Sequence, residues 1–147
     1  MESSIQKNNT GNTQEISNIL RILDANLNRL REGIRVVEDI LRYGFNNKEF
    51  ALCLKKIRHE CRVTSYFECL NARNSQEDVL KISTKEEQLR KNLENVFIAN
   101  FKRAQESARV LEEILKLENI QESEHFKNIR YKLYTLEKEI LITIFSS

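Results

Sequence analysis

The sequence predicts an all-α protein, a pseudo-two-fold helical bundle made from a duplicated helical hairpin. Its 147 residues include no proline and only three glycines, too few for the frequent tight turns of antiparallel sheets. Apolar residues recur at alternating spacings of three and four along most of the chain, as they do on the buried face of an α-helix. One helical segment also occurs twice.

Composition excludes several classes of protein. The 24 basic and 22 acidic side chains leave a net charge of only +2, so we expect no nucleic-acid partner. No apolar run approaches the roughly 18–20 residues of a membrane span, and the N-terminus has no signal-peptide pattern. Three cysteines, Cys53, Cys61 and Cys69, are spaced too far apart along one predicted helix to pair or share a zinc ion. We therefore expect a cytoplasmic protein with reduced, mostly buried cysteines.

The start of the chain differs from the rest. Residues 1–16 are polar and aperiodic, which predicts a flexible N-terminal tail before a single all-α domain at 17–147. Either Ser17 or Asp24 is a suitable N-cap for the first long helix, which should run to about Arg42. Its apolar stripe consists of Leu23, Leu27, Leu30, Ile34, Val37 and Leu41.

The second helix completes the first repeat, at about 17–71. Gly44 is well placed as the left-handed C-terminal stop of the first helix. The second helix is expected at about 47–71, although its last turns, 64–70, fit the apolar pattern of the earlier turns poorly.

The second repeat, at about 84–145, follows a polar connection at 72–83. Thr84 and Glu87 form a capping box that should start the third helix, which continues to about Leu117. The apolar stripe of this helix consists of Phe97, Phe101, Ala104, Ala108, Leu111 and Leu115. The fourth helix has its own apolar stripe of Phe126, Ile129, Leu133, Leu136 and Ile140.

The duplication is clearest in the first and third helices. Residues 25–42 align without gaps to 99–116, and nine of the 18 positions are identical, whereas unrelated helices would match at about one. A fainter similarity links 55–58 with 127–130, so both helices of the hairpin are expected to have been duplicated together.

Polar residues recur at every third position of the duplicated helix. The first copy has Asn26, Arg29, Glu32, Arg35 and Glu38, and the second has Asn100, Arg103, Glu106, Arg109 and Glu112. One interpretation is structural: pairs such as Arg29–Glu32 and Arg35–Glu38 form i,i+3 salt bridges, or link the two repeats around the two-fold axis. In that case they carry no function.

The other interpretation is an anion site. Arginine suits phosphate and carboxylate because its planar fork donates two parallel hydrogen bonds. Six arginines would then gather around the ligand: Arg29, Arg35, Arg103, Arg109, Arg58 and Arg130. The sequence has no glycine loop of the kind that holds phosphates in other folds, and His59 and His125 are isolated.

The motif D-A-N-x-x-R-x-x-E-G-x-R-V-x-E at 24–38 resembles the helical domain found beside thiamine phosphate synthase in many bacteria. Further similarity lies at 54–60, 99–113 and 129–138, so the resemblance spans about 20–141. It implies a kinase that uses ATP and Mg²⁺ to convert hydroxymethylpyrimidine phosphate to the diphosphate, which thiamine phosphate synthase consumes.

The resemblance also implies roles for particular residues. The expected catalytic residues are Arg29, Glu32, Arg103 and Glu106. The expected substrate- and phosphate-binding residues are Asn26, Arg35, Asn100, Arg109, Arg58, Arg130 and Arg73. Asp24 and Asp78 are the expected magnesium ligands, because carboxylates suit that ion.

Two alternatives to the kinase remain open. The chain could be a non-catalytic helical module that binds thiamine phosphate synthase, or an all-helical enzyme acting on another small dianion. The expected partners are a pyrimidine phosphate and thiamine phosphate synthase, and homo-oligomerisation is left open.

Overall fold

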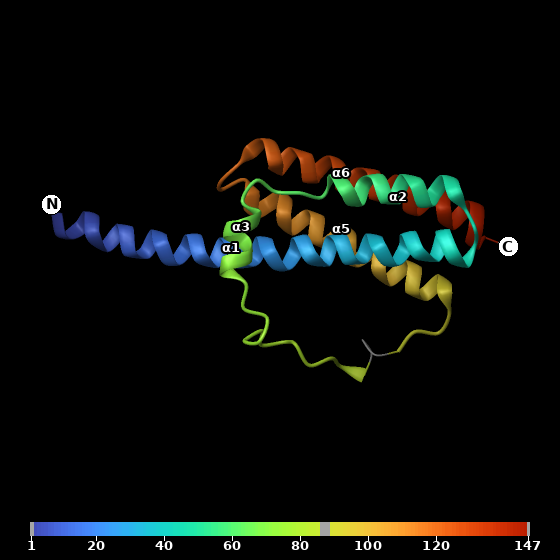
Figure 1. Ribbon diagram of the computed structural model, residues 1–147, viewed down its shortest axis with the longest axis horizontal. Helices are drawn as coiled ribbons and strands as arrows, with labels where there is room; N and C mark the ends of the chain where they lie inside the picture. The colour runs from blue at the N-terminus through green and yellow to red at the C-terminus, as the bar shows by residue number, and fades with distance from the viewer. Residues whose placement is uncertain (1, 86–88, 147) are drawn as a thin grey trace.

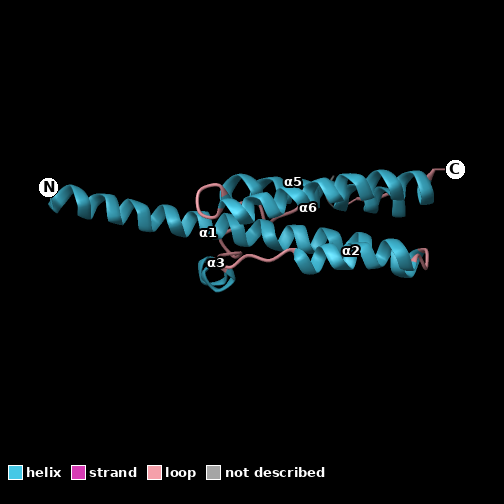
Figure 2. Ribbon diagram, turned by 90° about the horizontal axis from the view of Figure 1, so that it is seen from above, coloured by secondary structure: helices cyan, strands magenta, loops and turns pink. Residues whose placement is uncertain are grey.

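The computed structural model describes residues 2–85 and 89–146, which form a bundle of long helices without any strand (Figures 1 and 2). The predicted all-α fold class is therefore confirmed. The elements, in chain order, are α1 (Glu2–Asp39), the π-helical turn η1 (Ile40–Gly44), α2 (Lys48–Glu60), α3 (Tyr66–Ala72), α5 (Leu93–Leu115), α6 (Ile120–Ile140) and the π-helical turn η2 (Leu141–Phe145).

The two copies of the duplicated helix form the centre of the bundle. α1 and α5 run antiparallel and pack against each other more extensively than any other pair (Figure 1). α2 packs on α1, and α6 packs on α5, whereas α2 and α6 barely touch. The predicted apolar stripes are buried: their members are Leu23, Leu27, Leu30, Ile34, Val37 and Leu41 in α1, and Phe97, Phe101, Ala104, Ala108, Leu111 and Leu115 in α5. None of the described helices is both long and apolar enough to cross a membrane.

The first helix begins earlier than predicted. α1 starts at Glu2 instead of at Ser17 or Asp24, and its N-terminal part projects beyond the other helices (Figure 1). Side chains 12–18 are exposed along this projection. A polar segment can thus extend a helix that tertiary packing has already nucleated, because each added residue gains a backbone hydrogen bond. The division into a tail at 1–16 and a domain at 17–147 stays a prediction.

The predicted left-handed stop at Gly44 is wrong. Among the described residues the positive φ belongs to Asn46 (φ 50°), and Gly44 does not have one. The wide turn η1 carries the chain past Gly44, and the N–H of Asn47 then donates to the carbonyl of Leu41 (2.8 Å). Asparagine tolerates the left-handed conformation better than most residues with a side chain.

The predicted second helix is interrupted where its apolar pattern weakened. α2 ends at Glu60, and an irregular segment precedes α3. This segment buries Cys61 and Val63, two residues apart, which a helix would place on different sides. Burial raises the pKa of the Cys61 thiol to about 12. Cys69 is also buried, whereas Cys53 is exposed, so most of the cysteines are buried as predicted.

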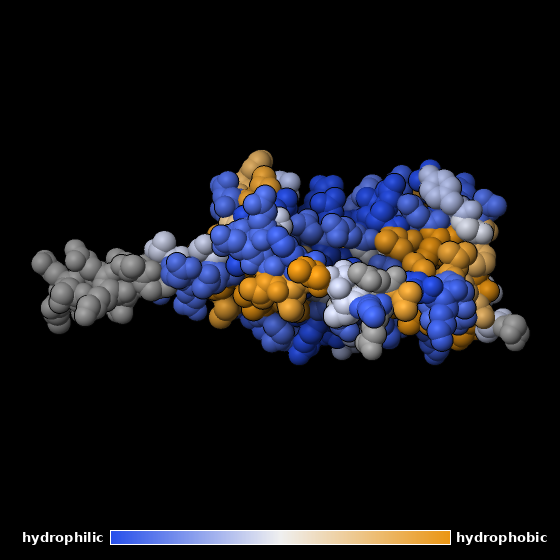
Figure 3. All heavy atoms as spheres, turned by 90° about the horizontal axis from the view of Figure 1, so that it is seen from below, coloured by the Kyte–Doolittle hydropathy of each residue, from blue (hydrophilic) through white to orange (hydrophobic). Residues whose placement is uncertain are grey.

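The duplicated helix of the second repeat begins later than predicted. α5 starts at Leu93, where the Asn92 side chain caps it by accepting from the N–H of Asn95 (2.9 Å). Of the predicted capping box, Glu87 lies outside the described residues. Most of the connection before α5 swings away from the bundle, and apolar patches are visible on the face of the molecule where it lies (Figures 1 and 3). Its exposed aliphatic side chains include Val79, Leu80 and Ile82.

Candidate functional site

The candidate site is built on the seam where α1 and α5 meet. Gly33 lies so close to α5 that a Cβ atom in its place would be 3.0 Å from the carbonyl oxygen of Asn100 and 3.4 Å from the backbone nitrogen of Ala104. The amides of Asn26 and Asn100 occupy equivalent positions and donate to carbonyls of their own helices, at 2.9 and 2.8 Å. Each side-chain amide thus has a hydrogen-bond partner within its own helix at the place where α1 and α5 pack closely.

The antiparallel register brings polar residues of both repeats together. Gly33 lies against residues 100–104 of α5 and is therefore level with about residue 102. Because the helices are antiparallel, each step back from Gly33 in α1 is level with one step forward from residue 102 in α5. Arg29 is therefore level with Glu106, and Glu32 with Arg103. We call Arg29, Glu32, Arg103 and Glu106 the seam quartet. All four are exposed, and none forms an ion pair with another described residue.

Two other predicted ligands, Arg58 and Arg130, form buried ion pairs. Arg58 of α2 donates from Nε to Oε1 of Glu38 (2.7 Å), and Arg130 of α6 donates from Nη2 to Oε1 of Glu112 (2.9 Å). Hydrogen bonding to Glu38 raises the pKa of Arg58, and the pKa of Arg130 is raised by hydrogen bonds to Tyr134 and Glu112. These pairs link the two helices within each hairpin, which neither interpretation of the sequence predicted.

Arg35 and Arg109 make weaker, half-exposed pairs at equivalent positions. Nη1 of Arg35 lies 3.9 Å from Oε2 of Glu38, and Nε of Arg35 lies 3.4 Å from Oδ1 of Asp39. Nη1 of Arg109 lies 3.2 Å from Oε2 of Glu112. Such pairs hold a guanidinium loosely and leave some of its donors available.

A hollow of about 490 Å³, the α1–α3 hollow, adjoins the seam. It brings together five predicted site residues: Asp24, Asn26, Arg29, Arg73 and Asp78. Its other lining residues are Asn18, Arg21, Ile22, Ala25, Asn28, Asn74 and Ser75. α1 forms one wall, and the segment that leaves α3 forms the other.

Two arginines fasten that segment to α1. Arg73 donates to both carboxylate oxygens of Asp24, at 2.8 Å each, and this raises the pKa of Arg73. Arg21 donates to the carbonyl oxygen of Asn74 (3.0 Å). The wall of the hollow is thus fixed by side chains of α1, although it belongs to an irregular segment.

A second hollow, the arginine hollow, follows along α1 with a volume of about 330 Å³. It is lined by Asn28, Arg31, Glu32, Arg35 and Arg58. Because Asn28 lines both hollows, they adjoin. Arg31, Asn28 and Arg21 were not predicted as site residues. The repeat gave no signal for them, because Gln105, Lys102 and Asn95 stand at their equivalent positions.

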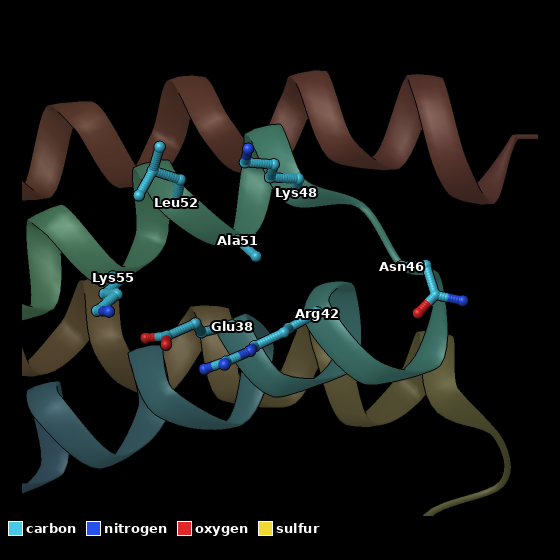
Figure 4. A pocket seen from close by; sticks show the side chains of 7 residues that line it. All are labelled: Glu38, Arg42, Asn46, Lys48, Ala51, Leu52 and Lys55. Atoms are coloured by element: carbon cyan, nitrogen blue, oxygen red, sulfur yellow. The ribbon is translucent and has the colours of Figure 1, made fainter.

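A third hollow, of about 280 Å³, lies between the end of α1 and the start of α2. Figure 4 shows the carboxylate of Glu38 pointing toward Lys55 of α2, with the side chain of Arg42, from η1, lying beside Glu38. The Glu38–Arg58 ion pair lies between this hollow and the arginine hollow, since Glu38 lines one and Arg58 the other.

The predicted magnesium ligands lie in one hollow but do not form a complete metal site. Both oxygens of Asp24 accept from Arg73, and Oδ1 of Asp78 accepts from the N–H of Leu80 (2.9 Å). No group of three or more histidine, cysteine, aspartate or glutamate side chains in the described part of the chain is placed to hold a metal ion. Any magnesium ion here would take most of its ligands from phosphate and water, as Mg²⁺ commonly does.

Comparison with curated proteins finds similar segments in longer chains. The sequence is 39% identical over 124 residues to the thiamine-phosphate synthase of Nostoc punctiforme and 40% identical over 125 residues to that of Prochlorococcus marinus subsp. pastoris. It is 36% identical over 135 residues to that of Thermosynechococcus vestitus. These matches cover 84–91% of this chain but only 35–38% of the relatives, so the chain spans about a third of their length. No solved structure matches.

The family match covers the whole candidate site. Residues 21–139 match the ThiD2 family, and this range includes the seam quartet and both adjoining hollows except Asn18. A match over most of the folded chain establishes membership. This chain belongs to the ThiD2 family.

Proposed function

We propose that this protein is a kinase of thiamine biosynthesis that transfers a phosphoryl group from ATP to hydroxymethylpyrimidine phosphate and makes the diphosphate. Similarity to about a third of the length of several thiamine-phosphate synthases supports a role in thiamine biosynthesis. The observation that carries the proposal is the pair of adjoining arginine-lined hollows beside the seam quartet. Two phosphorylated substrates need two neighbouring anion sites, and α1 forms part of the wall of both hollows.

The chemistry requires little of the protein beyond position and charge. In phosphoryl transfer, negative charge spreads over the oxygens of the transferred group, and fixed cations stabilise it. Arg29 and Arg103 are suited to this because neither forms an ion pair with a described carboxylate. The attacking atom is an oxygen of the substrate phosphate, already anionic at neutral pH, so no strong protein base is needed.

Mg²⁺ is part of the proposal. Bound to the nucleotide, the ion would neutralise charge on the phosphates. Glu32 in the arginine hollow and Asp78 in the α1–α3 hollow are the lining carboxylates that form no ion pair with described residues, so they are the best candidates for direct contact or contact through water. Asp24 is a weaker candidate, because Arg73 already occupies its oxygens.

A coupled assay of ADP release tests the proposal, with ATP, Mg²⁺ and hydroxymethylpyrimidine phosphate as substrates and phosphorus NMR to identify the product. We expect one diphosphate for each ADP. Arg62→Met is the matched control, since Arg62 is exposed and lines none of the hollows described above. A folded protein that releases no ADP above the rate without pyrimidine would overturn the kinase. Tight binding to thiamine phosphate synthase by such an inactive protein would favour a non-catalytic module.

A further inference from the structure

We infer that the two adjoining hollows divide the substrates: the arginine hollow binds the polyphosphate tail of the nucleotide, and the α1–α3 hollow binds the pyrimidine phosphate. This assignment rests on the proposed kinase function. The sequence could not make it, because the repeats offer two equivalent sets of residues. In the structure, the arginine hollow lies on the first repeat, and the α1–α3 hollow lies between the first repeat and the connection that follows it.

The lining of the arginine hollow suits phosphate and little else. It contains no apolar side chain, so an aromatic ring would find no wall to pack on. Three of its five residues are arginines, against a single carboxylate, Glu32. Arg31 is exposed and forms no ion pair with any described residue, which leaves all its donors available. A chain of phosphates offers many acceptor oxygens to such a set.

Arg58 gives the arginine hollow a fixed donor. Its Nε and Nη2 atoms are held by the two oxygens of Glu38 at 2.7 and 3.3 Å, so the guanidinium is oriented before any ligand binds. A donor positioned in advance loses less entropy on binding than a mobile one. Arg35, half-exposed beside it, can change partners from Asp39 to a ligand at little cost.

The α1–α3 hollow has the mixed lining that a heterocycle needs. Ile22 and Ala25 provide an apolar surface, and Nδ2 of Asn18 and the amide of Asn28 offer hydrogen bonds to ring nitrogens and an amino group. The amide of Asn74 is already bonded to Glu77 through both its nitrogen and its oxygen. Arg29, which forms no ion pair with any described residue, can bind the single phosphate. With about 490 Å³, this hollow is also the larger of the two.

The shared wall makes the transfer geometrically direct. A terminal phosphate in the arginine hollow and an acceptor phosphate in the α1–α3 hollow would meet at Asn28, which lines both. The bond from the bridging oxygen to the terminal phosphorus of ATP breaks, and an oxygen of the pyrimidine phosphate forms the new bond to that phosphorus. ADP leaves with the bridging oxygen, so atoms and charge balance.

Arg29→Met and Arg31→Met form a matched pair for the test. Both arginines are exposed residues of α1 without ion-pair partners among the described residues, and they line different hollows. Calorimetric titration would measure hydroxymethylpyrimidine phosphate alone and inorganic tripolyphosphate alone. We expect Arg31→Met to weaken tripolyphosphate binding about tenfold and to change pyrimidine phosphate binding less than about twofold. We expect Arg29→Met to weaken pyrimidine phosphate binding about tenfold and to change tripolyphosphate binding less than about twofold. Arg62→Met should leave the binding of both ligands unchanged.

The assignment is overturned if each variant weakens both ligands equally, if the two effects are exchanged, or if neither variant changes binding. Thermal melting must first show that both variants fold like the parent protein. Failure of the kinase proposal has a different signature: the binding effects separate as expected, but the parent protein shows no turnover. Turnover without separated effects would leave the kinase standing and remove the assignment alone.

Discussion

Each of the two hairpins contains an equivalent buried ion pair between its helices, but the surroundings of the two pairs differ. In each, a buried glutamate of the duplicated helix, Glu38 or Glu112, is paired with an arginine of the following helix. In the first hairpin the second helix is divided into α2 and α3, and Arg73, just after α3, pairs with Asp24 of α1. In the second hairpin α6 is continuous over 21 residues. The difference teaches that the repeated residues hold the scaffold, while the hollows depend on a departure from the repeat.

The two buried ion pairs, Glu38–Arg58 and Glu112–Arg130, are not identical. The guanidinium of Arg130 also lies 5.0 Å from the ring centroid of Tyr131 and 5.7 Å from that of Tyr134. No aromatic contact of this kind is found for Arg58 among the described residues. The second hairpin therefore secures its arginine more fully, and Arg58 stays closer to a hollow that a ligand can enter.

The largest expected effect on the free energy of unfolding comes from breaking these two buried ion pairs. Arg58→Met and Arg130→Met should each cost about 3 to 5 kcal/mol, because each leaves a buried carboxylate without its partner. Arg130→Met should cost more, since it also removes two aromatic contacts. Urea unfolding measures the free energies. The double variant Glu112→Gln/Arg130→Met should recover most of the loss, and a single variant that costs less than about 1 kcal/mol would show that the pair is not structural.

The seam quartet tests whether both hairpins contribute to function. Arg29→Met and Arg103→Met should each reduce kinase turnover about 10²-fold without unfolding the protein, as when one preorganised donor is lost. Lysine at either position should rescue little, because an ammonium group cannot donate in a two-pronged fork. Steady-state rates of the four variants decide the question. Full turnover in Arg103→Met, with loss only in Arg29→Met, would confine the site to the first hairpin.

A smaller effect is expected where the repeats differ at the seam. Gly33→Val should cost about 1 to 3 kcal/mol, because its Cβ would press on the backbone of α5 at Asn100. The equivalent residue in the second repeat is Ser107, whose hydroxyl donates to the carbonyl of Arg103 (2.7 Å). Ser107→Ala should cost at most about 1 kcal/mol, the contribution of one hydrogen bond. Equal costs in thermal or urea unfolding would contradict the close approach at Gly33.

The smallest effect concerns the length by which α1 exceeds α5, 38 residues against 23. Deleting residues 2–15 should change the free energy of unfolding by less than about 0.5 kcal/mol, because the helix projects past the bundle there. Activity should also be unchanged. A marked fall in melting temperature after this deletion would mean that the projection is docked in solution.

The sequence was informative where burial repeats with the period of a helix. It predicted the fold class and the apolar core stripes of α1 and α5, because the members of these stripes follow from their spacing alone. It was wrong about the stop at Gly44, where the chain instead forms the π-helical turn η1 and takes its positive φ at Asn46. It was also wrong about the continuity of the second helix, where long-range contacts hold the irregular segment. Thr64, for example, donates from its N–H to Glu122 of α6, 58 positions away (2.8 Å).

The same division applies to the candidate site. The sequence by itself determined which polar residues recur, and therefore named all four members of the seam quartet. Only the tertiary structure decided that Arg58 and Arg130 are held by buried carboxylates, while the seam quartet forms no ion pair with the residues that the structure describes. It also decided that Arg31 and Asn28 line the hollows, because an antiparallel seam and the segment after α3 place together residues that no repeat relates.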